Sequence, residues 1–107
     1  MRNYKNLEVW KKSHQLALKI YEVTKMFPSE EKFGIISQLR RASLSIPTNL
    51  VEGASRNSEK EFAYFINIAS GSVAEVEYLL EFSKSIGYLS LEDFNILNGE
   101  VIVVRKM

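Results

Sequence analysis

Hydrophobic residues recur at steps of three and four along most of this 107-residue chain, which is the spacing of helices that bury one face. The first such seam runs through Val9, Leu16, Ile20, Val23 and Phe27. Pro28 follows directly and cannot continue a helix, because it lacks the backbone N–H. The pattern therefore predicts a first helix over about residues 7–27.

A second helix is predicted over about residues 30–52. Ser29 has a side chain suited to capping its start, and Gly53 is suited to the left-handed conformation that often ends a helix. Pro47 lies inside this helix, where its missing N–H leaves the carbonyl of Ser43 without a partner. We therefore expect the second helix to be kinked at Pro47.

The third predicted helix is the longest and covers about residues 58–87. Ser58 and Glu61 form a capping box at its start, with a helix-capping serine followed three residues later by a glutamate. Its core seam runs through Phe62, Ile66, Ala69, Val73, Val76 and Leu80. The helix is expected to end near Gly87.

The last segment, residues 91–106, fits two structures. Ser90 and Asp93 form a second capping box, which favours a helix. The buried face of that helix would consist of Phe94, Leu97, Val101 and Val104. The pair Asn98-Gly99 is also typical of a β-hairpin turn, here within residues 95–105. We favour the helix, because an isolated hairpin beside three helices would have no sheet to join.

Four helices joined by short loops predict an all-α fold, an antiparallel up-down-up-down four-helix bundle that forms one domain over residues 1–107. Hydrophobic residues make up 46% of the chain, which is enough for one core. No apolar run approaches the roughly 20 residues of a membrane span, and the first residues lack the apolar segment of a secretion signal. We therefore expect a cytoplasmic protein without membrane contact.

The side chains on which most enzymes and metal sites depend are nearly absent. The chain has no cysteine and one histidine, His14. Thiolate metal sites and histidine cages are therefore excluded, and a serine nucleophile would have only His14 as its base. The glycine-rich motif that cradles nucleotide phosphates is also missing. We expect no catalytic site, metal ion, cofactor or small-molecule substrate.

Two of the predicted helices carry more apolar surface than one bundle core can cover. Apolar residues widen the buried arc of the second helix, and the third helix has a second apolar row almost opposite its core seam. Large apolar patches are uncommon on monomers, so we expect a homo-oligomer. The predicted interface consists of Leu44, Pro47, Val51, Tyr64, Ile68, Gly71, Tyr78, Leu79, Phe82 and Ile86.

A polar stripe borders the core face of the second helix. It consists of Gln38, Arg41, Ser45, Asn49 and Glu52. Their spacing of three or four residues allows neighbours to hydrogen-bond along the helix. Glu75, among apolar residues of the third helix, needs a cation, for which Arg41 and Arg56 are the candidates. Both a structural network and a ligand site are open interpretations, and we favour the network.

The segment QLRRASLSIPTNLVEGASRNSEKEF, residues 38–62, resembles a family of proteins encoded in intervening sequences of bacterial 23S rRNA genes. The stretches LEVWKKSHQLALKIYEVTKMFP and IASGSVAEVEYLL extend the likeness over nearly the whole chain, and the family includes accessory variability proteins of diversity-generating retroelements. The resemblance implies a four-helix bundle that assembles into a barrel-like homopentamer, without catalysis and with a role in binding nucleic acid. The matching motif positions are Gln38, Arg41, Ser45, Asn49, Glu52, Arg56 and Glu75.

Charge is unevenly distributed along the chain. Residues 1–27 hold six lysines and arginines against two glutamates, and residues 58–100 hold two lysines against eight acids. The basic residues predicted to bind a nucleic-acid backbone are Lys5, Lys11, Lys12, Lys19, Arg40 and Arg56. The alternative is an oligomeric scaffold for a protein partner without nucleic-acid binding. The net charge of +1 favours the scaffold, whereas the resemblance favours nucleic acid.

Overall fold

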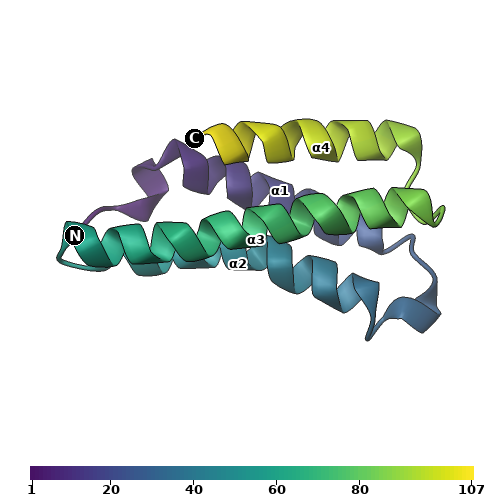
Figure 1. The fold of residues 1–107 in the computed structure, drawn as a ribbon, viewed down its shortest axis with the longest axis horizontal. Helices are drawn as coiled ribbons and strands as arrows, with labels where there is room; N and C mark the ends of the chain where they lie inside the picture. The colour runs from purple at the N-terminus through teal and green to yellow at the C-terminus, as the bar shows by residue number, and fades with distance from the viewer.

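A computed structural model describes all residues from 1 to 107 and contains four α-helices and two 3-10 turns. The helices are α1 (Glu8–Thr24), α2 (Ile35–Ala54), α3 (Glu59–Ser85) and α4 (Leu91–Lys106). Short 3-10 turns, Tyr4–Asn6 and Ser29–Glu31, precede α1 and α2. Consecutive helices run in opposite directions (Figure 1). The fold is therefore an all-α four-helix bundle, as the hydrophobic pattern predicts.

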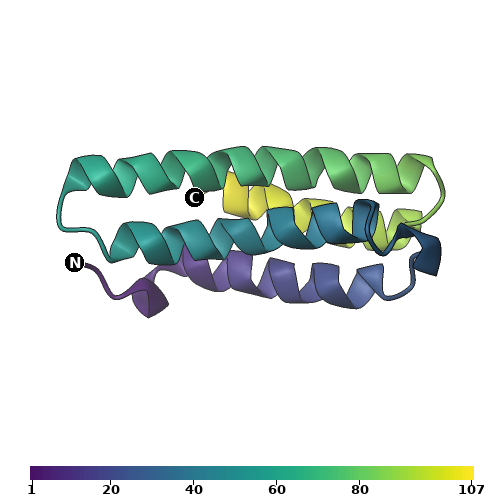
Figure 2. The same cartoon turned by 90° about the horizontal axis from the view of Figure 1, so that it is seen from below.

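Each helix packs closely against two others, and the backbones of helices on opposite corners of the bundle stay further apart. The order around the bundle is α1, α2, α3, α4 and back to α1, with the most extensive contact between α2 and α3. Figure 2 shows α2 and α3 side by side over most of their length. The side chains at the centre of the core are Leu16, Ile20, Leu39, Ile46, Leu50, Val76, Leu80, Leu97 and Val101.

The serine of each predicted capping box caps its helix, and the last segment is helical. The Ser58 hydroxyl accepts the backbone N–H of Glu61 at 3.1 Å. The Ser90 hydroxyl accepts the N–H of Asp93 at 3.0 Å. Each bond satisfies a donor that a helix start would otherwise leave unpaired. Residues 95–105 are helical throughout, so the hairpin alternative is wrong.

The start of α2 is the main departure from the predicted boundaries. The helix begins at Ile35 and not near residue 30, because residues 29–31 form a tight 3-10 turn. In that turn the N–H of Glu31 bonds the carbonyl of Pro28, and the N–H of Lys32 bonds that of Ser29. The side chain of Ser29 makes no capping bond to either helix start, so its predicted capping role is wrong.

Gly53 was expected just beyond α2, yet it lies inside the helix and is buried. Its φ is not positive, and only Gly87, after α3, has the left-handed conformation. A Cβ at Gly53 would come within 3.1 Å of the Phe65 Cβ and 3.4 Å of the Phe62 ring. The missing side chain therefore lets α3 approach α2 closely at this point.

α2 continues through Pro47 without a break in its helical backbone. The Ser43 hydroxyl donates to the carbonyl of Arg40 at 3.0 Å, a local bond within the turn that Pro47 disturbs. A kink at Pro47 stays a prediction. None of the four helices combines the length and the apolar character that a membrane span requires.

Alanine substitutions at two helical glycines should have opposite effects. Gly99, in α4, has no atom within 4 Å of the position of a Cβ, so Gly99→Ala should raise the free energy of unfolding by about 0.5–1 kcal/mol. Gly53→Ala gains the same backbone preference but must displace Phe65, so we expect it to be less stable than Gly99→Ala by more than about 1 kcal/mol. Urea unfolding followed by circular dichroism measures both, and equal gains would contradict the close α2–α3 contact.

A second prediction concerns the phenol of Tyr88, in the turn between α3 and α4. It donates to the Glu31 carboxylate at 2.9 Å. This hydrogen bond, with partial burial and the negative charge of Glu31, raises the pKa of Tyr88 above its ordinary value. Because the pKa is higher in the folded state, the bond stabilises the fold below about pH 10 and is lost as the pH rises through the folded pKa.

An ultraviolet titration of the tyrosines tests this. We expect one tyrosine of the wild type to ionise later than the others, and Tyr88→Phe to remove that late step. Tyr21→Phe, at an exposed site on α1, is the control and should leave it in place. A late step that persists in Tyr88→Phe would contradict the assignment.

Candidate functional site

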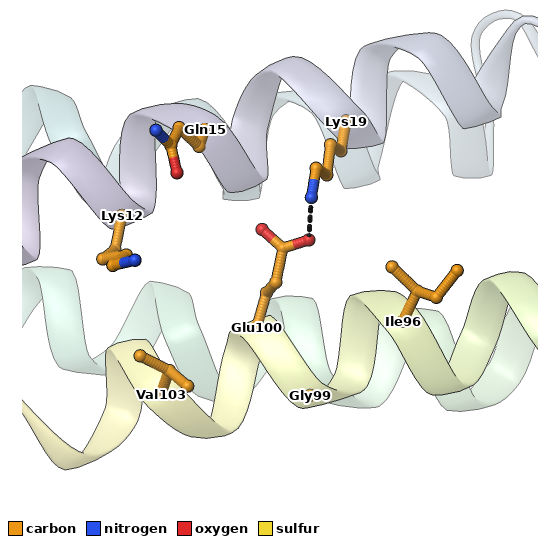
Figure 3. Close-up of a pocket in the computed structure, with 7 residues that line it drawn as sticks. All are labelled: Lys12, Gln15, Lys19, Ile96, Gly99, Glu100 and Val103. Carbon is orange, nitrogen blue, oxygen red and sulfur yellow. Dashed lines mark hydrogen bonds and ion pairs between the residues drawn. The ribbon is translucent and has the colours of Figure 1, made fainter.

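A groove of about 340 Å³ runs along the surface between α1 and α4. It is lined by Lys12, Gln15, Lys19, Ile96, Gly99, Glu100 and Val103. Figure 3 shows Lys12, Gln15 and Lys19 on α1, facing Glu100, Ile96 and Val103 on α4. Gly99 adds no side chain, and nothing lies within 4 Å of where its Cβ would be, so the groove is open there. The surface combines basic, amide and apolar groups.

One ion pair crosses this groove. The Lys19 Nζ lies 2.6 Å from a Glu100 carboxylate oxygen, and the dashed line in Figure 3 marks this contact. Lys12, two turns before Lys19 on α1, is exposed and has no ion-pair partner. The same holds for Lys5, in the first 3-10 turn. Of the three lysines that recur every seven residues, two are therefore free and one is held by the only acid of the groove.

The other three predicted basic residues are engaged elsewhere in the chain. Lys11 pairs with Glu8 within α1 at 3.2 Å. The Arg40 guanidinium donates to the Thr24 hydroxyl at 2.8 Å and to a carbonyl of α1 at 3.1 Å. Arg40 therefore lies between α1 and α2, and not in the groove between α1 and α4. The structure does not bring the six predicted residues together on one surface.

Arg56 lies on the side of the bundle where α2 meets α3. It pairs with Glu52 at 3.3 Å, and its guanidinium carbon lies 4.9 Å from the centre of the Phe65 ring. Its Nε is buried without a hydrogen-bond partner. The ion pair ties the side chain to α2 and the ring contact holds it against α3, so Arg56 is not on the surface that carries Lys12 and Lys19.

Part of the predicted polar stripe forms a hydrogen-bonded network. The Asn49 side-chain amide donates to the carbonyl of Ser45 at 2.8 Å and to its hydroxyl at 3.0 Å. Ser72 on α3 completes the network, because its hydroxyl donates to that of Ser45 at 2.8 Å. Sequence reasoning missed Ser72, whose position in the small-residue stretch ASGS was the available signal. Gln38, at the other end of the stripe, is exposed.

Glu75 does not form the ion pair that the sequence suggests, at least within one chain. Its side chain is exposed, and no lysine or arginine nitrogen lies within 4.0 Å of its carboxylate. Arg56 is bonded to Glu52, and Arg41 is exposed without a partner. The neighbouring acid, Glu77, bonds Arg105 across to α4. The free carboxylate follows from the position of Glu75 on the outer side of α3.

The predicted interface residues divide into exposed and buried groups. Exposed or half-buried on α2 and α3 are Leu44, Val51, Tyr64, Ile68, Gly71, Tyr78, Phe82 and Ile86. Pro47 and Leu79 are buried within the single chain, so they offer little surface to another molecule. The apolar face of α3 is therefore narrower than the sequence predicts.

The one histidine is part of an aromatic stack at the start of α1. The His14 and Trp10 rings are nearly parallel with centroids 5.0 Å apart, and Tyr4 packs edge-on against Trp10. These aromatic contacts give His14 a packing role at the start of α1. No group of three or more His, Cys, Asp or Glu side chains is placed to hold a metal ion.

Comparisons with known proteins agree with this fold. No curated protein is similar enough in sequence to be counted as a relative. A crystal structure of a protein of unknown function from the S23 ribosomal protein family of Bacteroides thetaiotaomicron superposes with a TM-score of 0.84 at 29% identity, covering 92% of this chain and 88% of that one. Residues 5–107 match the family model described as 23S rRNA-intervening sequence protein. The chain therefore belongs to the family of 23S rRNA-intervening sequence proteins.

Proposed function

We propose that this protein is a non-enzymatic, homo-oligomeric helical-bundle protein that binds the phosphate backbone of RNA or DNA along α1. The observation that carries the proposal is the position of Lys12 and Lys19, seven residues apart on one bank of the open α1–α4 groove. Lys5, exposed in the 3-10 turn before α1, adds a third free or exchangeable cation at this end of the chain. The family of this protein is named after intervening sequences of 23S rRNA, which is in keeping with a role near RNA.

The groove has the donors that a phosphate backbone requires. The ammonium of Lys12 is free, and the amide of Gln15 lies between the two lysines. Lys19 is paired with Glu100, but its side chain is 54% exposed. Ion pairs at such exposed positions contribute little free energy, so Lys19 can exchange the carboxylate for a phosphate at small cost.

Assembly would turn this modest surface into a multivalent one. A net charge of +1 per chain gives one copy little attraction for nucleic acid. Rotational symmetry repeats the same lysine row on every copy, and simultaneous contacts raise the overall affinity well above that of one site. We propose five copies, on the strength of the resemblance to the pentameric family.

A second candidate function is supported by the apolar part of the same groove. Ile96 and Val103 are 51% and 46% exposed there, and a helix of a protein partner could cover them. The engagement of Lys11, Lys19, Arg40 and Arg56 within the chain also lowers the number of free cations. In this case the oligomer is a scaffold without nucleic-acid binding.

Replacing Lys5, Lys12 and Lys19 together with glutamine tests the proposal. Each phosphate contact that is lost should flatten the plot of log affinity against log salt by about one unit, largely irrespective of base sequence. The measurement is a salt titration of binding to structured RNA and to duplex DNA. The control replaces Lys25, Lys32 and Lys60, which removes the same charge outside the groove and should leave the slope nearly unchanged.

Two outcomes would contradict the proposal in different ways. A wild type that binds neither probe at low salt would favour the scaffold function. If the wild type binds and the triple glutamine variant binds equally well, the site is misplaced, and Arg40 with Arg56 would be tested next.

Glu100→Gln should strengthen binding, because it releases Lys19 and removes the only acid from the groove. An exposed ion pair is worth up to about 1 kcal/mol, so we expect a gain in affinity of up to about fivefold. Glu81→Gln is the matched control, since Glu81 pairs with Lys84 outside the groove, on α3. Weaker binding or no change for Glu100→Gln would argue against a phosphate at Lys19.

A further inference from the structure

The outer side of α3 carries a row of side chains that no other part of the chain covers. The row consists of Tyr64, Ile68, Gly71, Glu75, Tyr78, Phe82 and Ile86. Its large apolar members have exposed fractions between 37% and 63%. Steps of three and four residues are the spacing of a seam that packs against another helix. Among the helices, α3 contacts only α2 and α4, so this seam has no partner within the chain.

Glu75 lies at the centre of this α3 row and restricts what can cover it. The carboxylate is free of ion pairs, with Gly71 and Tyr78 as its neighbours along the row. Covering the apolar members would also remove water from Glu75. A buried carboxylate without a partner is costly, so the covering surface must present a cation.

The chain itself carries one free cation of the right kind. It has five arginines, and four are engaged with other groups of the chain: Arg2, Arg40, Arg56 and Arg105. Arg41 is exposed and makes no hydrogen bond, ion pair or ring contact. A guanidinium is also the cation best suited to pairing with a carboxylate, because it can donate two parallel hydrogen bonds.

Arg41 and Glu75 lie on the same side of the bundle. The hydrogen bond between Ser45 and Ser72 sets the middle of α2 against the middle of α3. The two helices are antiparallel. Arg41 lies one turn before Ser45, and Glu75 lies about one turn after Ser72, so the two residues are at the same level of the bundle. Yet their charged atoms are not within 4.0 Å of each other, so each copy presents one free charge of each sign on this side.

We propose that a second copy of this chain covers the α3 row, and that Glu75 of one copy pairs with Arg41 of the next. The inference rests on the self-association proposed above and specifies its contact. The α3 row then packs beside Arg41 on α2, where Leu44 is 47% exposed and Val51 is half-buried. Two different surfaces meet in a head-to-tail contact, and such a contact forms a ring when the rotation from copy to copy closes. In a closed ring every Glu75 and every Arg41 has a partner.

Charge reversal tests this pairing. Glu75→Arg and Arg41→Glu each place like charges in the contact, and each should raise the dissociation constant of the oligomer by at least about tenfold. The molar mass is measured by light scattering over a dilution series, and far-ultraviolet circular dichroism verifies that each variant is folded. Glu30→Arg and Lys32→Glu are the controls, because they make the same charge changes at exposed residues without ion pairs, away from the α3 row, and should assemble like the wild type.

A double variant and a mixture of the two single variants distinguish an ion pair between copies from an ion pair within one chain. The double variant R41E/E75R should assemble like the wild type, because each contact then has a reversed pair. An equimolar mixture of the two single variants should assemble more tightly than either variant alone, because every contact between unlike copies has opposite charges and a ring of five needs only one contact between like copies. Recovery in the double variant without recovery in the mixture would place the pair within one chain and overturn the proposal.

The remaining outcomes distinguish the contact from the assembly. An oligomer that is unaffected by Glu75→Arg would show that the copies associate through another surface, while the proposed self-association stands. A wild type of 12.3 kDa at micromolar concentration would overturn both the contact and the self-association.

Discussion

The close packing of α2 against α3 determines where every other feature of this bundle lies. These two helices are the longest, and they share the most extensive contact. Gly53 lets the backbones approach near one end, and the Ser45–Ser72 hydrogen bond sets the register near the middle. Once this register is set, α1 and α4 can cover only the remaining core faces. The outer side of α3 and the polar stripe of α2 are left on one surface.

The hydrophobic pattern and the capping residues were sufficient to predict the four helices. Hydrophobic residues that recur with a period near 3.6 over a long segment are a strong sign of a helix. The hydroxyls of Ser58 and Ser90 cap their helices, as their sequence context suggests. The same context was misleading at Ser29, where a 3-10 turn precedes α2. Gly53 was misplaced because a glycine near the end of a pattern suits both a helix end and a close contact. Only the position of Phe65, on another helix, shows that Gly53 serves a close contact between helices and not a helix end.

The candidate sites were less predictable, because they depend on distances between helices. A row of lysines on α1 can be read from spacing, but nothing in the local sequence indicates that Glu100, 81 residues later, pairs with Lys19. Pro47 and Leu79 were assigned to an exterior surface because a helical wheel cannot give the width of the neighbouring helices. Conversely, the sequence did single out Glu75 as a carboxylate in need of a cation. The structure adds that Arg41 is the one arginine still without a partner.

The pairing of the first helix with the last one has a further consequence, for the order in which the chain folds. Contacts between α2 and α3 join neighbouring segments across a short turn, whereas α1 and α4 meet only after the chain has closed on itself. Until α4 is in place, the core residues of α1 and α3 that it covers remain in contact with water. During synthesis, a nascent chain of three helices therefore exposes one open side of its core. The Lys19–Glu100 contact belongs to the final step that closes it.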